Sequence, residues 1–233
     1  MNKLSLVILV SMVLGKFTIY GQNMRIYPSI EGLTEFEIPT VYSTDWYNLN
    51  HSKDDYYTDH TGNVIISNIS KSRESILEVQ DGKLIGTNYG EWGGKLIFKN
   101  DKIEYTILQK NICGIINFGN EIYVLTGLSH LGIREGKIIK IEQINGKWKC
   151  TFNIDLNNSP EIFDVFENEL YIVTFDGLAI FDGNNIQQLL KKQFWANLYP
   201  QSIYVNEKII GIGLRGCIAI INKENNEVKY YKK

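Results

Sequence analysis

The chain has 233 residues and a nearly balanced charge, with 24 lysines and arginines against 26 aspartates and glutamates. Binding to nucleic acid or to an anionic membrane requires concentrated Lys and Arg, because phosphate groups must be neutralised. The sequence has no such concentration, so neither partner is expected. The length is typical of one domain rather than two.

The first 21 residues have the pattern of a secretory signal peptide. Lys3 precedes an apolar run over residues 4–14, and Gly21 is a small residue suited to a cleavage site. The run is too short for a membrane-spanning helix, which needs about 20 apolar residues. We therefore expect residues 1–21 to be removed during export to the periplasm or the medium. The alternative interpretation is a buried N-terminal strand.

Residues 75–233 repeat one pattern four times. Each unit contains an apolar strand, a tight polar turn, a second strand, a glycine-containing loop, a third strand, another polar turn and a fourth strand. The equivalent apolar positions Leu84, Ile122, Leu170 and Ile209 are separated by 38, 48 and 39 residues. Propeller blades recur with a similar period of roughly 40–50 residues. The sequence therefore predicts an all-β fold, a small β-propeller.

We expect residues 22–233 to form one propeller domain of about five four-stranded blades. Residues 75–233 supply four of them, and residues 22–74 supply a divergent first blade with a polar insertion at residues 48–61. Four blades with an N-terminal extension are the alternative. The segment 186–193 fits a short helix as well as a strand, but its place as a fourth strand favours the strand.

The loops between second and third strands are expected to share one face of the propeller with the links between blades. Aromatic and charged residues gather in these loops, whereas the opposite turns contain residues that tight turns require. Loops that carry Trp, Tyr and Arg on a rigid scaffold are common binding sites. The structural alternative is that Trp92 and Trp195 plug the axis while Arg215 bonds neighbouring carbonyls. The predicted ligand- or partner-binding residues are Tyr89, Trp92, His130, Arg134, Asp176, Trp195, Tyr199 and Arg215.

No cofactor and no metal site is predicted. Residues 211–216 match the dinucleotide fingerprint G-x-G-x-x-G letter for letter. That motif requires a following helix, whereas residues 217–221 have the composition of a strand. His51 and His60 lack the spacing of metal ligands.

The three cysteines are expected to be structural. Cys113, Cys150 and Cys217 each lie among apolar strand residues, where a thiol behaves as a small hydrophobic group. Their odd number leaves at least one of them unpaired, and one disulfide is the open alternative.

Three classes of function are compatible with the loop residues. The favoured class is an exported non-enzymatic binding module that recognises a protein, peptide or glycan. The second is an extracytoplasmic inhibitor or immunity protein. The third is a hydrolase or lyase acting on glycans, which needs two carboxylates about 5 Å or 6.5–9.5 Å apart. No spacing singles out a pair, although the candidates are Glu91, Asp164, Asp176 and the adjacent Asp54 and Asp55.

Four loop segments carry a resemblance to known sequences. They are residues 92–96 (WGGKL), 127–132 (GLSHLG), 199–203 (YPQSI) and 213–216 (GLRG). In this order they resemble a group of uncharacterised bacterial exported proteins with β-propeller-like repeats, over about residues 75–233. The resemblance implies the fold and supports the loops named above, and it implies no activity.

Overall fold

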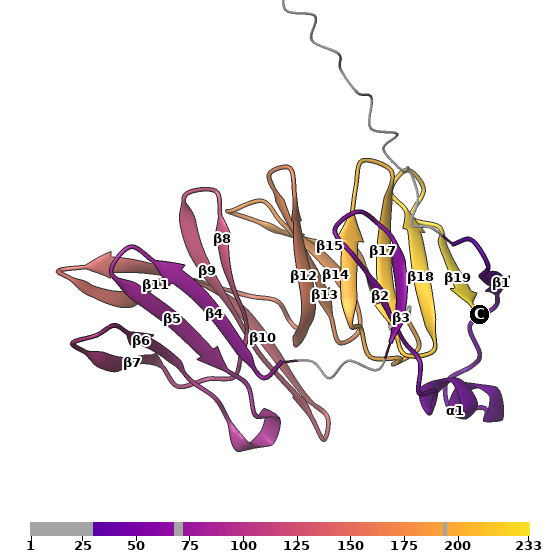
Figure 1. Ribbon diagram of the computed structural model, residues 1–233, viewed down its shortest axis with the longest axis horizontal. Helices are drawn as coiled ribbons and strands as arrows, with labels where there is room; N and C mark the ends of the chain where they lie inside the picture. The colour runs from indigo at the N-terminus through magenta and orange to yellow at the C-terminus, as the bar shows by residue number, and fades with distance from the viewer. Residues whose placement is uncertain (1–29, 68–71, 193–194) are drawn as a thin grey trace, which may run out of the picture.

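The computed structural model describes residues 30–67, 72–192 and 195–233, and the predicted signal peptide lies outside these residues. The described chain is all-β, with four four-stranded antiparallel units arranged in chain order (Figure 1). The first sheet contains β4 (Glu74–Val79), β5 (Gly82–Thr87), β6 (Leu96–Lys99) and β7 (Glu104–Leu108). The second sheet contains β8 (Ile112–Phe118), β9 (Glu121–His130), β10 (Ile133–Ile144) and β11 (Lys147–Asp155).

The third and fourth sheets repeat the same order. The third contains β12 (Pro160–Phe166), β13 (Glu169–Thr174), β14 (Leu178–Phe181) and β15 (Ile186–Leu190). The fourth contains β16 (Ser202–Val205), β17 (Ile209–Leu214), β18 (Cys217–Asn222) and β19 (Val228–Lys232). The four sequence repeats therefore correspond to four sheets, and the strand predicted in the segment 186–193 is confirmed for residues 186–190.

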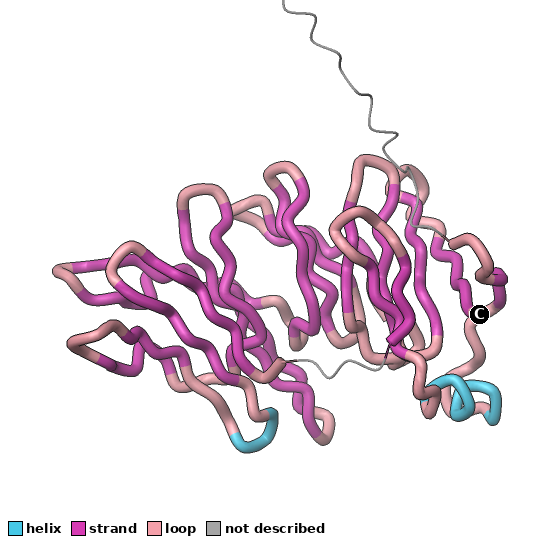
Figure 2. Tube along the Cα trace, in the orientation of Figure 1, coloured by secondary structure: helices cyan, strands magenta, loops and turns pink. Residues whose placement is uncertain are grey.

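The arrangement of the sheets is propeller-like. The first strands of successive sheets contact each other, β4 with β8, β8 with β12, and β12 with β16. The other strands follow outward in sequence order, so that each sheet packs beside its neighbours (Figure 2). β8 approaches β12 closely at Gly114, where an added Cβ would overlap the ring of Phe163 and the ring would have to move.

Apolar side chains fill the space between adjacent sheets. Leu84 and Phe98 of the first sheet pack with Val124 and Ile141 of the second. Similar clusters join the second sheet to the third and the third to the fourth. Middle strands such as β13, β17 and β18 are covered on both faces, and they are therefore apolar blocks rather than alternating sequences.

The N-terminal segment differs from the expected four-stranded blade. Among the described residues 30–67, β1 (Thr34–Phe36) pairs with β19 at the outer edge of the fourth sheet. A short helix α1 (Thr44–Asn50) follows, and β2 (Asp55–Thr58) and β3 (Val64–Ser67) form a two-stranded sheet. Residues 68–71 of the expected blade lie outside the described residues.

The predicted polar insertion at residues 48–61 contains the strand β2 instead of a loop. Tyr56 of this strand is buried and packs on Ile209, Ile218 and Ile220 of the fourth sheet. The polar composition of the segment concealed this strand, because an aromatic side chain buries a large apolar area even between charged neighbours. The backbone of β2 lies directly against β17 at Gly213, where a Cβ would overlap the carbonyl oxygen of Tyr56.

No helix in the described part of the chain is long and apolar enough to cross a membrane. Cys150 and Cys217 are free thiols, and all three cysteines of the chain are among the described residues. The alternative of one disulfide is therefore excluded in this structure.

Candidate functional site

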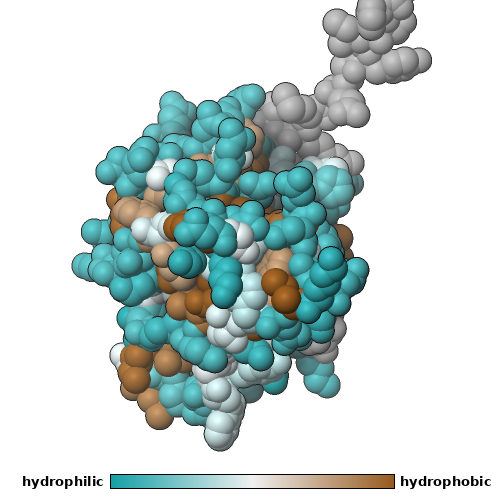
Figure 3. Space-filling view, turned by 90° about the vertical axis from the view of Figure 1, so that its left-hand side faces the viewer, coloured by the Kyte–Doolittle hydropathy of each residue, from teal (hydrophilic) through white to brown (hydrophobic). Residues whose placement is uncertain are grey.

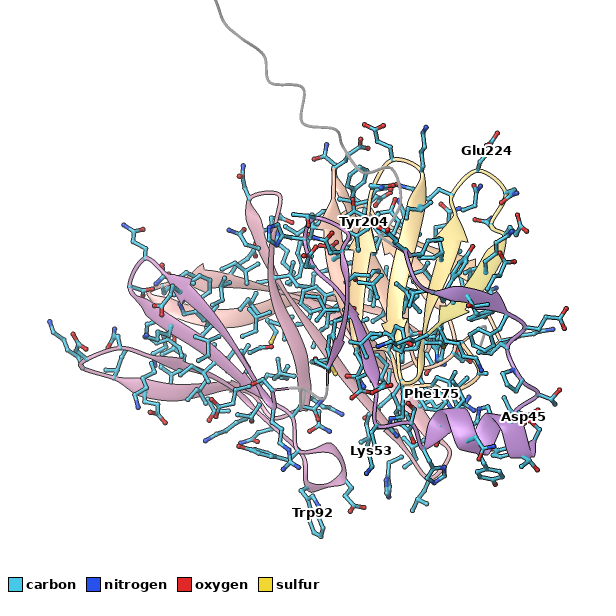
Figure 4. All side chains as sticks on the ribbon, turned by 45° about the vertical axis from the view of Figure 1, so that its right-hand side comes forward. Asp45, Lys53, Trp92, Phe175, Tyr204 and Glu224 are labelled. Carbon is cyan, nitrogen blue, oxygen red and sulfur yellow. The ribbon has the colours of Figure 1, made fainter. Side chains whose placement is uncertain are left out.

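The loops between second and third strands lie at one end of the four sheets. This end, called the loop face below, comprises residues 88–95, 131–132, 175–177 and 215–216. Figure 4 shows Trp92 and Phe175 of these loops at this end, together with Lys53 and Asp45 from the N-terminal segment. Tyr204 and Glu224 lie toward the opposite end.

Trp92 is the most exposed indole of the described chain, with 84% of its surface accessible. It ends a short 3-10 helix, η1 (Gly90–Trp92), in the loop between β5 and β6. Gly90 and Gly93 have φ angles of 62° and 84°, which suit glycine because it has no Cβ. Asn111 donates from Nδ2 to the carbonyl of Gly90 at 2.7 Å and holds the turn against the second sheet.

A contact between Glu91 and His130 connects this turn to the tip of the second sheet. Glu91 Oε2 and His130 Nε2 are 2.9 Å apart. Leu131 follows His130 in the tight β9–β10 turn and is 90% exposed. Since Trp92 and Leu131 are the chain neighbours of the two contacting residues, both lie in the same region of the loop face.

We call this region the apolar rim, because four exposed apolar or aromatic side chains belong to it. Figure 3 views the side of the molecule formed by the first two sheets, and hydrophobic residues appear at its lower end among hydrophilic ones. The apolar rim consists of Tyr89, Trp92, Leu131 and Ile133.

A cleft of about 590 Å³ opens beside the apolar rim, between the first and second sheets. Small-molecule sites generally have volumes of about 300–1,000 Å³. Trp92 and Glu91 line the cleft from the loop, and Gln109, Lys110 and Asn111 line it from the link between the sheets. Glu135, Lys137 and Asn153 complete the wall that the second sheet provides.

Three of the four charged side chains that line the cleft have partners of opposite charge, and the fourth, Glu91, contacts His130. Lys110 Nζ lies 3.6 Å from Glu135 Oε1, and Lys137 Nζ lies 3.2 Å from Asp155 Oδ1. Both pairs are about half exposed, so each contributes little to stability. A charged ligand in the cleft would nevertheless compete with these pairs for their charged groups.

Arg134 and Asp176 meet between the second and third sheets. Arg134 Nη1 is 3.9 Å from Asp176 Oδ2, and its guanidinium carbon is 4.3 Å from the centre of the Phe175 ring. A cation above an aromatic face is attracted by the ring quadrupole. These two predicted binding residues therefore connect adjacent sheets to each other.

Arg215, in the β17–β18 turn, and Tyr199, in the link before β16, form a second contact of this type. The guanidinium carbon of Arg215 is 4.4 Å from the centre of the Tyr199 ring, and Nη1 donates to the carbonyl of Asn50 at 3.2 Å. Arg215 Nε also lies 3.8 Å from Asp55 Oδ1. The hydrogen bond to Asn50 agrees with the alternative interpretation of Arg215, in which its guanidinium binds a neighbouring backbone carbonyl and not a ligand.

Trp195 is a core residue rather than a surface residue. Only 1% of it is exposed, and it belongs to the apolar cluster of the third and fourth sheets. The following link has positive φ angles at Ala196, Asn197 and Tyr199, which are costly for residues other than glycine. Trp46 of α1 stabilises this link by donating from Nε1 to the carbonyl of Ala196 at 2.6 Å.

Among the predicted catalytic candidates, Glu91, Asp176, Asp55 and Asp164 have different surroundings, and no two of them share a contact. Glu91 contacts His130, Asp176 contacts Arg134, and burial raises the pKa of Asp55, an effect opposed by Arg215. Burial likewise raises the pKa of Asp164, which accepts a hydrogen bond from the backbone of Val165.

Two acidic residues that line one pocket were not among the predicted site residues. Glu74 and Glu161 line a pocket of about 270 Å³ together with Arg73, between the first, second and third sheets. Glu74 begins β4 and Glu161 is the second residue of β12, both inner strands. The sequence feature that could have indicated this pocket is an acidic residue at or next to the start of each of these two inner strands.

No protein-family model and no curated protein matches the chain. Among solved structures, the chain is similar to a luciferin-regenerating enzyme, with 11% identity and a TM-score of 0.45 over 77% of this chain and 68% of the enzyme. It is also similar to apo AztD from Citrobacter koseri, with 12% identity and a TM-score of 0.37 over 73% of this chain. The match spans 51% of AztD, about half its length. Neither similarity identifies a family or an activity for this chain.

Proposed function

We propose that this protein is an exported, non-enzymatic binding module that recognises its ligand through the apolar rim of the loop face. The observation that carries the proposal is the 84% exposure of Trp92 on a turn held by hydrogen bonds. An indole exposed to water lacks the large favourable free energy that burying its apolar surface would give, so a partner that covers it gains this free energy. Trp is also enriched among the residues that dominate binding energies.

The other predicted binding residues support a narrower site than the whole loop face. Arg134, Asp176, Tyr199 and Arg215 make contacts within the protein, and Trp195 is in the core. Side chains already engaged in this way have less capacity for a partner. Recognition is therefore assigned to the first and second sheets.

We further propose that the sheets form a five-unit propeller, in which the β2–β3 sheet takes the fifth place. The contacts of β2 with β16 and β17 support this arrangement, since inner strands of successive units contact each other. Spin labels on β3 and β4 test it by electron resonance. A separation like that between β4 and β8 is expected, and a much longer one contradicts ring closure.

The binding proposal is tested by comparing three immobilised proteins, the wild type, Trp92→Ala and Tyr42→Ala. Tyr42 is a matched control, because it is 71% exposed and precedes α1 rather than belonging to the apolar rim. Extracellular material from the producing organism should contain a component that the wild type and Tyr42→Ala retain and Trp92→Ala loses. Equal retention by all three proteins would refute the site.

Export is tested by determining the N-terminus of the protein recovered from the producing cells. A mature chain that begins at Gln22 outside the cytoplasm supports export, and a cytoplasmic chain that begins at Met1 contradicts it. For the inhibitor or immunity alternative, the retained component would be an enzyme whose activity falls when the protein is added.

A second candidate function rests on the pocket shared by Glu74 and Glu161. Two carboxylic residues that line one pocket can act as acid and base or nucleophile in glycoside hydrolysis, if their carboxylates have the separation that the reaction requires. If the protein is such an enzyme, it should release reducing ends from a polysaccharide, and both Glu74→Gln and Glu161→Gln should abolish the release. Absence of release across a panel of polysaccharides would dismiss this candidate.

A further inference from the structure

We propose that the cleft between the first and second sheets binds a neutral glycan, with one sugar ring stacked on Trp92 and the adjoining part of the glycan inside the cleft. The inference rests on the proposed binding function and specifies the chemistry of its ligand.

The position of Trp92 supplies the first argument. Trp92 borders the cleft, and its indole is 84% exposed at the lower end of the molecule (Figure 4), so a ligand that extends out of the cleft can meet a face of the indole. One face of a pyranose ring presents mainly C–H groups, and its hydroxyl groups point outward around the edge. Stacking this face on an indole buries apolar surface on both partners and leaves the hydroxyl groups free to form hydrogen bonds.

The second argument is the supply of uncharged hydrogen-bonding groups. Gln109, Asn111 and Asn153 line the cleft, and each amide side chain has donors and an acceptor. Asn111 donates from Nδ2 to Gly90, and its Oδ1 is buried without a hydrogen-bond partner among the described residues, whereas Gln109 and Asn153 are exposed and accessible to a ligand. Sugar hydroxyl groups both donate and accept, and they therefore match these amides.

The third argument is charge. The ion pairs Lys110–Glu135 and Lys137–Asp155 engage three of the four charged side chains that line the cleft, and the fourth, Glu91, contacts His130. An anionic ligand would meet the carboxylates of Glu91 and Glu135, and a cationic ligand would meet Lys110 and Lys137, whereas a neutral ligand leaves these contacts intact. Glycans that contain uronic acid or sulfate groups are accordingly disfavoured relative to neutral ones.

A peptide ligand fits these walls less well. The side chains of a peptide ligand generally bind in apolar pockets at the centre of an interface. In this cleft Ile139 is buried and Leu108 and Leu128 are half-buried, so the accessible groups are mainly amides, paired charges and one indole. This balance favours a flat, polyhydroxylated ligand.

The experiment applies the full chain to an array of neutral gluco-, galacto-, manno- and xylo-oligosaccharides and their uronic-acid and sulfated counterparts. Titration calorimetry then measures the best neutral oligosaccharide with the wild type and variants. Trp92→Ala and Asn153→Ala should each weaken binding about tenfold or more, and Tyr42→Ala should not change it. Trp92→Phe should keep most of the affinity but lose the ligand-dependent change in tryptophan fluorescence.

The outcomes separate this inference from the function on which it rests. Preferential binding of charged glycans, or neutral binding unaffected by Asn153→Ala, overturns the inference. A protein partner that depends on Trp92 but not on Asn153, with no glycan binding, also overturns it and leaves the binding function standing. If no ligand of any kind depends on Trp92, both proposals fail.

Discussion

Gly213→Ala tests how the N-terminal hairpin is held on the fourth sheet. Gly213 lies on β17, and a Cβ added there would overlap the carbonyl oxygen of Tyr56 and lie 2.5 Å from Ser202 Oγ. Cβ atoms essentially never approach other atoms closer than 3.0 Å. Because the nearest atom belongs to the backbone of β2, no rotation of a side chain relieves the overlap. The hairpin β2–β3 must move away from β17.

The expected cost is at the upper end of what overpacking causes, about 3 kcal/mol. For a chain of this size, 1 kcal/mol changes the melting temperature by about 2–4 °C, so a decrease of about 6–12 °C is expected. Thermal unfolding followed by circular dichroism measures this decrease. Hydrogen exchange should also increase in residues 55–67, where the Thr58 amide donates to Ser202 Oγ at 2.7 Å in the wild type.

Two further substitutions serve as controls. Gly93→Ala has open space around the added Cβ, but its φ of 84° and ψ of −164° lie in a region that only glycine adopts readily, which leaves a cost of about 1–3 kcal/mol from backbone strain alone. Gly114→Ala meets only the ring of Phe163, which can turn, so its cost should be smaller than that of Gly213→Ala. Wild-type stability and exchange in Gly213→Ala would refute the docking of β2 on β17.

Other predictions concern buried groups. Trp195→Ala removes a side chain that is 1% exposed and should lower the free energy of unfolding by about 3–5 kcal/mol, measured by urea denaturation. Burial and a hydrogen bond to Glu121 raise the pKa of Tyr123 to about 12. The unfolded state therefore loses this proton at lower pH than the folded state, so stability should fall as pH rises from about 10 to 12, and Tyr123→Phe should show a smaller fall. A thiol reagent should label the exposed Cys150 before Cys217, which is buried and whose pKa burial raises to about 12; mass spectrometry of peptides measures the order.

The repeated strands and their turns could be predicted from the sequence, because they depend on neighbouring residues. The turn between β16 and β17 contains Asn206, whose side chain accepts hydrogen bonds from the amides of Lys208 and Ile209. The turn between β8 and β9 contains Gly119 with a φ of 63°. Such residues favour a turn wherever they occur, and the apolar blocks between them favour covered strands.

The N-terminal segment could not be predicted in the same way. The strand β1 has only three residues and pairs with β19, at the other end of the chain. A strand this short leaves no periodic pattern in the sequence. Its position depends on the free edge that β19 offers, and that edge exists only after the fourth sheet has formed.

The same distinction between local sequence and distant contacts applies to the candidate site. The sequence alone determined which loops carry aromatic and charged residues, because strand period and turn chemistry are local. It did not distinguish Trp92 from Trp195, two loop tryptophans that the fold leaves 84% and 1% exposed. Only the tertiary structure decided that difference, and it also engaged Arg134 and Arg215 in contacts within the protein. Exposure depends on which distant segments pack against a residue, and no local pattern records those segments.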